Sequence, residues 1–157
     1  MGYTHYFETK EEISLNTWKN YFIPAVKTIL MEADKQGIPT AGPAGEADTI
    51  PEFADDRIMF NGVGEAAHET MVIHRTPIEF DFCKTNRKPY DAVCVAVAVL
   101  AKALFSSEFD WRSDGMCELY FDREGKELLK SALEIKSDSG INRTNIMDKI
   151  DNLVHVW

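Results

Sequence analysis

The segment from residue 92 to residue 105 is apolar at almost every position, and it constrains the fold more than any other part of the chain. Its valines alternate between residues 93 and 99 as they would in a buried strand. However, Pro89 stands where a helix could begin, and Asp91 falls in the first turn that would follow. We therefore predict a helix that is covered on nearly all sides. The longest apolar run, 92–101, is about half of what a membrane span needs.

Elsewhere the spacing of apolar residues distinguishes strands, with a period of two, from helices, with a period near 3.6. The sequence predicts strands at 3–8, 57–63, 70–75, 78–83 and 109–112, and helices at 18–33, 92–105, 116–135 and 144–154. Pro24 lies inside the first helix, so we expect a kink or break near Phe22. The predicted fold class is α+β: an antiparallel sheet of four or five strands, with the helices packed mainly on one face. The strands between residues 57 and 83 are expected to form a meander.

The length of 157 residues matches one ordinary domain that can bury a sizeable core. We therefore expect residues 1–157 to form a single globular domain that ends in a short amphipathic helix at about 144–154. Prolines and glycines are concentrated at about 37–56, which predicts a flexible loop. Such a loop is either a functional flap or a bystander.

The charge balance bears on the possible partners. The chain carries 17 Lys and Arg residues against 26 Asp and Glu residues, a net charge of −9. This acidity makes nonspecific nucleic-acid binding unfavourable, and the aromatic residues do not alternate with cations along the chain as in a single-strand binding platform. Acidity commonly serves solubility. The alternative is an acidic face that competes for a basic partner surface.

The cysteines and the first residues of the chain bear on its location. The three cysteines have no C-x-x-C spacing, which indicates free thiols in a reducing compartment. The first segment is already strand-like, so no signal peptide is expected. With no membrane-length apolar run, the sequence predicts a cytoplasmic protein.

Three cations, Lys84, Arg87 and Lys88, lie within five residues of one another where a predicted strand leads into the apolar helix. Backbone N–H groups at a helix start have no partner inside the helix and attract anions. We therefore predict an anion site built from these cations and the helix start behind Tyr90, with Asn61 as a further binding residue. A nucleotide or another phosphate compound is the natural ligand.

A second group of polar residues could move protons. We predict His68 as a general acid or base, with Glu69 fixing its tautomer, and His5 as a less favoured candidate. The alternative is a buried polar network that holds sheet to helix, in which His68 or Glu69 pairs with Arg87 and Asp91 caps the helix. A single histidine among aromatic residues on a strand, such as His5, is more often structural.

Recognised cofactor and hydrolase motifs do not occur in the chain. It has no glycine-rich nucleotide loop, nucleophile elbow, zinc-protease motif or EF-hand pattern. The sequence therefore indicates no particular cofactor, and we predict no metal site. Whether the protein is an enzyme stays open.

Five segments occur in order: GYTHYF, DRIMFNG, HET, FCKTNRKPYD and SDG. Together they resemble a family of small, uncharacterised bacteriophage and prophage proteins whose members open on Gly-Tyr-Thr-His-Tyr-Trp. The resemblance covers roughly residues 2–115; Phe7 stands where the family usually has tryptophan, and the tail from Ser137 has no counterpart. It implies a phage-encoded accessory protein in the host cytosol, and it brings no activity.

Two functions follow as hypotheses. The first is a binding or catalytic pocket for a small anion, which requires the His, Lys and Arg side chains to converge in one cleft. The second is a non-catalytic acidic phage inhibitor that binds a host protein such as a defence nuclease. An inhibitor should instead present a continuous acidic or apolar face.

Overall fold

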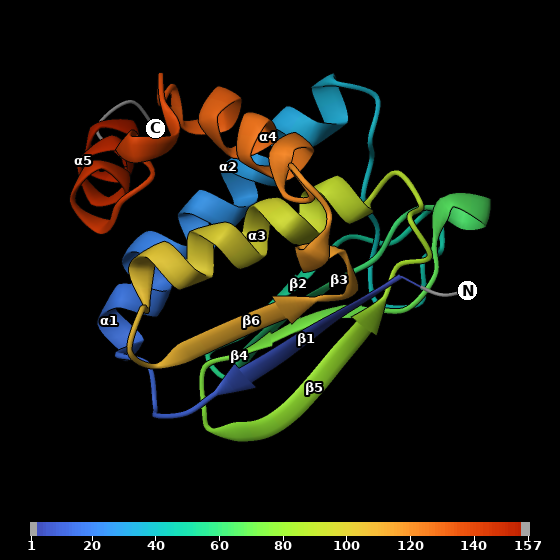
Figure 1. Ribbon diagram of the computed structural model, residues 1–157, viewed down its shortest axis with the longest axis horizontal. Coiled ribbons are helices and arrows are strands. Elements are labelled where there is room, and N and C mark those ends of the chain that lie inside the picture. Colours follow the sequence, from blue (N-terminus) through green and yellow to red (C-terminus); the bar gives the residue numbers. More distant parts are fainter. Residues whose placement is uncertain (1–2, 155–157) are drawn as a thin grey trace.

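The computed structural model describes residues 3–154, which form one layer of helices over strands (Figure 1). The strands are β1 (Thr4–Thr9), β2 (Glu52–Phe53), β3 (Arg57–Phe60), β4 (Met71–His74), β5 (Ile78–Lys84) and β6 (Phe109–Ser113). The helices are α1 (Leu15–Thr17), α2 (Ile23–Lys35), α3 (Asp91–Leu104), α4 (Arg123–Leu133) and α5 (Arg143–Val154). A π-helical turn, η1 (Trp18–Phe22), joins α1 to α2, and the short 3-10 turns are η2 (Gly64–Ala66), η3 (Asp114–Cys117) and η4 (Asp138–Gly140).

The strands form two antiparallel three-stranded sheets, ordered β5-β1-β6 and β2-β3-β4. The α+β class is confirmed, but one sheet of four or five strands is not what the chain forms. The predicted meander continues only from β2 to β4, because β5 pairs along its length with β1 instead. Where β4 and β5 approach each other, the Glu69 backbone N–H donates to the Lys84 carbonyl (3.2 Å).

The order of elements explains why the helices gather on one face. The segment β5-α3-β6 is a strand, a helix and a second strand, and β5 and β6 flank β1 in the sheet. This is the split β-α-β arrangement, which places the connecting helix α3 on one side of the strands, and α2 and α4 pack against α3 there. Figure 1 shows α2, α3 and α4 on that side of β1 and β6. In the described chain, the outer face of the β5-β1-β6 sheet carries no helix.

Burial follows the sequence pattern closely at the centre of the molecule. In β1 the side chains of His5, Phe7 and Thr9 are buried, and those between them are partly exposed. Helix α3 is buried along almost its whole length, as predicted, because α2, α4 and the strands pack around it. No helix within residues 3–154 is long and apolar enough to cross a bilayer.

The first long helix accommodates its proline without a break. Ser14 caps the start of α1, and the helical path continues through η1 into α2. At the end of η1 the Ile23 N–H donates to the Trp18 carbonyl, five residues earlier. This wider turn precedes Pro24, which has no N–H to donate. The expected kink near Phe22 is therefore a π turn.

Of two helices predicted near the C-terminal end, the structure shortens one and confirms the other. The helix predicted at 116–135 begins only at Arg123, and Tyr120 has a left-handed φ of 62°. The side chains of Leu119 and Tyr120 are exposed, so their apolar spacing does not reflect an inward face. By contrast, α5 spans Arg143–Val154 as predicted.

The segment from 38 to 51 has no regular structure, but it is hydrogen-bonded to the strands. Ala41 and Asn61 exchange both backbone hydrogen bonds, at 2.9 and 3.1 Å. The Gly64 N–H donates to the Gly45 carbonyl (2.8 Å). The loop therefore packs beside β3, and its flexibility stays a prediction.

Candidate functional site

The junction between β5 and α3 is a tight turn with an unusual backbone. Asn86 and Arg87 have φ values of 54° and 56°, in the left-handed region. Asparagine tolerates this region, whereas arginine occupies it at a cost of about 1 kcal/mol. The turn places the Arg87 guanidinium over the ring of Tyr3, 4.4 Å from its centroid. The junction thus directs a cation toward the start of β1.

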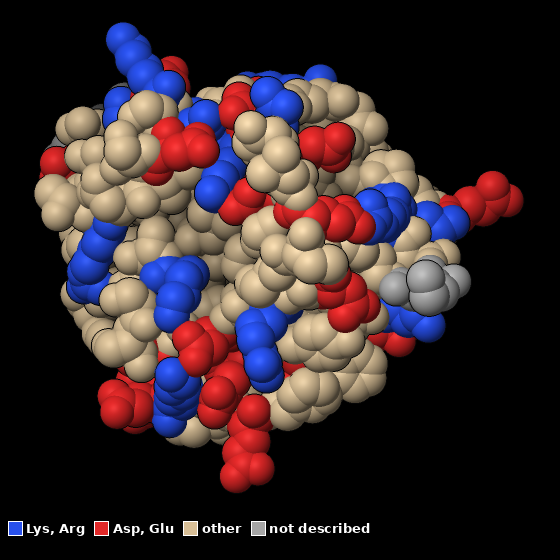
Figure 2. All heavy atoms as spheres, in the orientation of Figure 1, with Lys and Arg blue, Asp and Glu red and all other residues tan. Residues whose placement is uncertain are grey.

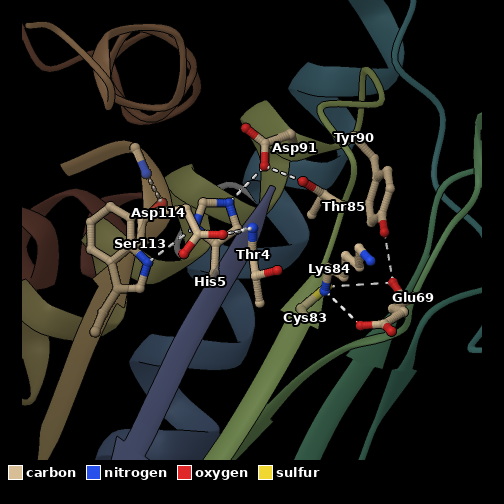
Figure 3. Close-up of polar contacts among 12 residues, drawn as sticks. Thr4, His5, Glu69, Cys83, Lys84, Thr85, Tyr90, Asp91, Ser113 and Asp114 are labelled. Carbon is tan, nitrogen blue, oxygen red and sulfur yellow. Dashed lines mark hydrogen bonds and ion pairs between the residues drawn. The ribbon is translucent and has the colours of Figure 1, made fainter. Parts of the chain in front are cut away.

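A hydrogen-bonded chain joins this junction to β1 (Figure 3). The Nε2 atom of His5 lies 2.6 Å from Oδ1 of Asp91, and the Thr85 hydroxyl donates to the same oxygen (2.5 Å). Both His5 and Thr85 are 0% exposed. Asp91 therefore ties the first turn of α3 to the central strand of the sheet.

The other ring nitrogen of His5 fixes its tautomer. The indole N–H of Trp111 donates to Nδ1 of His5 (3.3 Å). Because Nδ1 accepts this bond, Nε2 carries the proton and donates to Asp91. Both nitrogens are engaged in the protein interior. The structure thus gives His5 a structural position, with no ring nitrogen left to accept a substrate proton.

Asp91 does not cap α3. The N-cap residue is Tyr90, which makes no side-chain cap bond, and the carboxylate of Asp91 turns to His5 and Thr85 instead. The amides of Val93 and Cys94 donate to the Tyr90 carbonyl, each at 3.0 Å. These N–H groups are therefore engaged within the chain. An anion here would depend on side-chain cations more than on the backbone of α3.

Glu69 and Lys84 form a second polar group, seen at the other side of Figure 3. The Glu69 carboxylate accepts from the Lys84 backbone N–H (2.7 Å), and its carbonyl accepts from the Tyr90 hydroxyl (2.7 Å). These bonds fasten the approach to β4 onto the end of β5. His68, the adjacent residue, is exposed.

Asn61 uses all of its amide's hydrogen-bonding capacity within the chain. Its Nδ2 donates to the carbonyls of Pro43 and His68 (3.0 and 3.1 Å). Its Oδ1 accepts from the N–H groups of Gly62 and His68 (2.8 and 3.1 Å). A primary amide has two donors and two main acceptor positions. Asn61 therefore clamps two loops together and has nothing left for a ligand.

A pocket of about 420 Å³ lies between the start of α3 and the segment that leads into α4. It brings together cations from both elements, Arg87, Lys88 and Arg123. Carboxylates and aromatic rings complete the lining. The lining residues are Tyr3, Arg87, Lys88, Pro89, Asp91, Ala92, Val95, Glu118, Leu119, Tyr120, Phe121, Arg123, Glu124 and Gly125.

The three cations of this pocket have different partners within the chain. Arg87 donates to the Glu118 carboxylate (2.6 Å), and the two side chains are 60% and 49% exposed. This bond raises the pKa of Arg87 further. Arg123 lies over the ring of Tyr120, 5.2 Å from its centroid, and the Lys88 ammonium donates to the Glu65 carbonyl (3.0 Å). Arg87 and Arg123 are thus the cations that can turn toward a ligand.

Of the site residues predicted from the sequence, the structure places Arg87 and Lys88 together in the pocket. It does not bring the others into it: Lys84, Asn61, His5, His68 and Glu69 are absent from the lining. Sequence reasoning missed Glu118 and Arg123. They reach the pocket because α4 packs against α3, a long-range contact with no local signal. The apolar Leu119-Tyr120 pair is the one local sequence signal near these residues, and its exposure is seen only in the structure.

Burial disfavours ionisation of two nucleophilic groups near α3, the Tyr90 hydroxyl and the Cys94 thiol. It raises the pKa of the Tyr90 hydroxyl and the pKa of the Cys94 thiol well above their ordinary values. Neither group can then ionise near neutral pH. Within residues 3–154, no group of three or more His, Cys, Asp or Glu side chains could hold a metal ion.

The surface charge is mixed on the face seen in Figure 2. Lys and Arg side chains are interspersed with Asp and Glu side chains over this face, with no continuous acidic surface across it. The net charge of −9 is thus not gathered into a single patch on this side.

Comparisons of the chain with family models, with curated proteins and with solved structures found no match. The candidate site therefore stands on its own geometry.

Proposed function

We propose that the pocket between α3 and α4 binds a small anion, with a phosphate group as the part that is recognised. The observation that carries this proposal is the contact between Glu118 and Arg87. A carboxylate from an irregular, exposed segment lies on a guanidinium at the edge of the pocket, 2.6 Å away. Exposed ion pairs of this kind contribute little to stability, so a ligand can replace the carboxylate at low cost.

The surroundings favour an anion in that position. Arg123 lies across the pocket from the start of α3, and its guanidinium can pair with two oxygens of a phosphate, as that of Arg87 can. The first turns of α3 and α4 both line the pocket, and helix N-termini carry partial positive charge. Rings of Tyr3 and Tyr120 beside these cations offer surfaces for a base or sugar.

Asp91 is the residue through which such a ligand would meet the buried network. Its side chain is 20% exposed, and Oδ1 is occupied by His5 and Thr85. The other oxygen can accept a hydrogen bond from a ligand hydroxyl. This chemistry supports binding of a phosphorylated, hydroxyl-bearing molecule, and a nucleotide fits it. Proton transfer by His68 has no support from this arrangement, because His68 does not line the pocket.

The test is a titration of the full chain with pyrophosphate and with ADP, followed by calorimetry. Replacing both Arg87 and Arg123 with alanine should weaken binding of either probe at least tenfold, since two charge-assisted contacts are removed. Lys84→Ala is the matched control: it removes a nearby cation outside the pocket and should change affinity less than twofold. Equal loss in both variants would contradict the proposed location.

A third variant moves affinity in the opposite direction. Glu118→Gln removes the carboxylate that competes for Arg87 and should tighten pyrophosphate binding several-fold. Unchanged or weaker binding would mean that Glu118 does not occupy the place of the ligand. Thermal unfolding of each variant verifies that all are folded.

The phage origin and the inhibitor role stay predictions. The mixed charge of the face in Figure 2 gives the acidic-inhibitor hypothesis no support on that side. An anion pocket is compatible with a phage accessory protein that binds a nucleotide. We favour the small-ligand function over capture of a host protein because Arg87, Lys88 and Arg123 converge in one pocket.

A further inference from the structure

The outer face of the β5-β1-β6 sheet exposes aromatic side chains. Phe80 and Phe82 on β5 are 59% and 49% exposed, and Tyr6 lies beside them on the central strand. The ring centroids of Tyr6 and Phe80 are 6.0 Å apart, and those of Phe80 and Phe82 are 5.8 Å apart. Exposed phenylalanines two residues apart on a strand are costly for a free surface and indicate a partner.

Cations lie on the same face at defined register positions. Tyr6 pairs with Phe82 on one side and with Arg112 on the other, and Lys84 pairs with Thr4. Arg112 and Lys84 are both exposed. The sequence predicted no alternation of aromatic residues with cations. The fold produces it, because residues from strands far apart in the chain become neighbours.

The size of the face limits what can occupy it. Three strands about 4.8 Å apart and five to seven residues long cover roughly 300 Å². A stable protein interface needs about 800 Å² on each partner. On the four-stranded sheets of known RNA-binding domains, exposed aromatic side chains stack two or three bases of a single strand. A hollow of about 350 Å³ beside Tyr6, Phe80 and Arg112 gives room for a base.

We propose that this face is a stacking platform for two or three nucleotides of single-stranded nucleic acid. The rings of Tyr6, Phe80 and Phe82 take the bases, and Arg112 and Lys84 pair with the flanking phosphates. This site lies on strands, apart from the pocket at α3, and it does not depend on the proposed function of that pocket.

The charges around the platform determine how much electrostatic attraction contributes to its affinity for nucleic acid. Glu8 and Glu79 line the hollow and repel phosphates, whereas Asp110 is paired with Lys10 (2.6 Å) and Lys102 (2.8 Å). The described cations on the face are Arg112 and Lys84, and the Asp114 carboxylate accepts from the Tyr6 hydroxyl (3.0 Å), so stacking carries the affinity. We therefore expect log Kd to change with log salt concentration by a slope of only about 1 to 2. Because stacking does not distinguish sequences, the platform departs from the prediction that this acidic chain does not bind nucleic acid nonspecifically.

The test uses fluorescein-labelled octanucleotides of mixed sequence, single-stranded DNA and RNA, in fluorescence anisotropy titrations of the full chain. The double variant Phe80→Ala/Phe82→Ala should weaken binding at least thirtyfold, since each stacked base contributes about tenfold. The conservative variant Phe80→Tyr/Phe82→Tyr keeps both rings and should bind within threefold of the natural chain. Met31→Ala, which removes an exposed apolar side chain on α2, should have no effect.

Other results would overturn the proposal. They are no saturable binding of either octanucleotide, equal binding of the matching duplex, or a loss in the alanine variant that is no greater than in Met31→Ala. A second copy of the chain is the competing occupant of this face. If sedimentation shows a dimer that Phe80→Ala/Phe82→Ala dissociates, and no oligonucleotide binds, the platform is a dimer interface and the nucleic-acid proposal fails.

Discussion

Replacing Asp91 with alanine is expected to lower the free energy of unfolding by about 3 kcal/mol. The substitution leaves the Nε2–H of His5 and the hydroxyl of Thr85 without their acceptor, and both residues are fully buried. Each buried donor left unsatisfied costs about 1–3 kcal/mol. Alanine recovers only a few tenths of this through its helix propensity. Urea denaturation followed by circular dichroism measures the loss.

Asp91→Asn is the matched control for this prediction. The asparagine oxygen can still accept from His5 and Thr85, so we expect a loss of less than half that of Asp91→Ala. If alanine at this position costs under 0.5 kcal/mol, a threshold set by ordinary surface substitutions, the network does not hold α3 to β1.

Replacing Gly125 with valine is expected to lower the free energy of unfolding by about 3 kcal/mol. A Cβ atom at Gly125 would lie 2.3 Å from Cγ1 of Val95 and 2.8 Å from the backbone N of Ala96. Helices α3 and α4 must therefore separate, and overpacking of this kind typically costs 1–3 kcal/mol, occasionally more. Because Gly125 also lines the pocket, the shift should weaken pyrophosphate binding as well. Denaturation and calorimetry on the same variant measure both effects.

Glu127→Val tests whether the effect is specific to the helix contact. Residue 127 lies on α4 two residues later, with an exposed side chain, so the same new side chain should cost under about 0.5 kcal/mol. A Gly125→Val variant as stable as Glu127→Val would show that α3 and α4 do not approach as closely as described.

Local periodicity predicted most elements, because burial follows it in β1 and α3; β5 is an exception, since its apolar Phe80 and Phe82 are exposed. The apolar segment 92–105 became α3, and the alternation around His5 and Phe7 became β1. The division into two sheets was not predictable in this way. Hydrophobic alternation fixes which face of a strand is buried, but it does not say whether β5 pairs with β4 or with β1.

The helix predicted at 116–135 shows a different limit. Leu119 and Tyr120 have helical spacing with respect to later residues, yet both are exposed. Apolar periodicity assumes that apolar residues face inward, and that assumption fails in a segment that borders a pocket. Four of the misassigned residues, 118–121, line the candidate site.

The candidate site was half predictable from the sequence. The cation cluster correctly marked the junction of β5 and α3, but the fold separates Lys84 from Arg87 and adds Arg123 from a distant element. The predicted catalytic residues do not lie together: His5 is part of a buried network, and His68 is on the surface. Sequence spacing reports residues that are near in the chain, whereas the pocket depends on the packing of α4 against α3.

The most direct test of the anion pocket is an NMR titration of the nitrogen-15-labelled chain with pyrophosphate. We predict the largest changes in amide chemical shift within residues 87–92 and 118–125. Smaller changes are expected at His5, because its ring is hydrogen-bonded to Asp91. Saturating changes centred on His68, Glu69 and Lys84, or no saturable change in either segment, would contradict it.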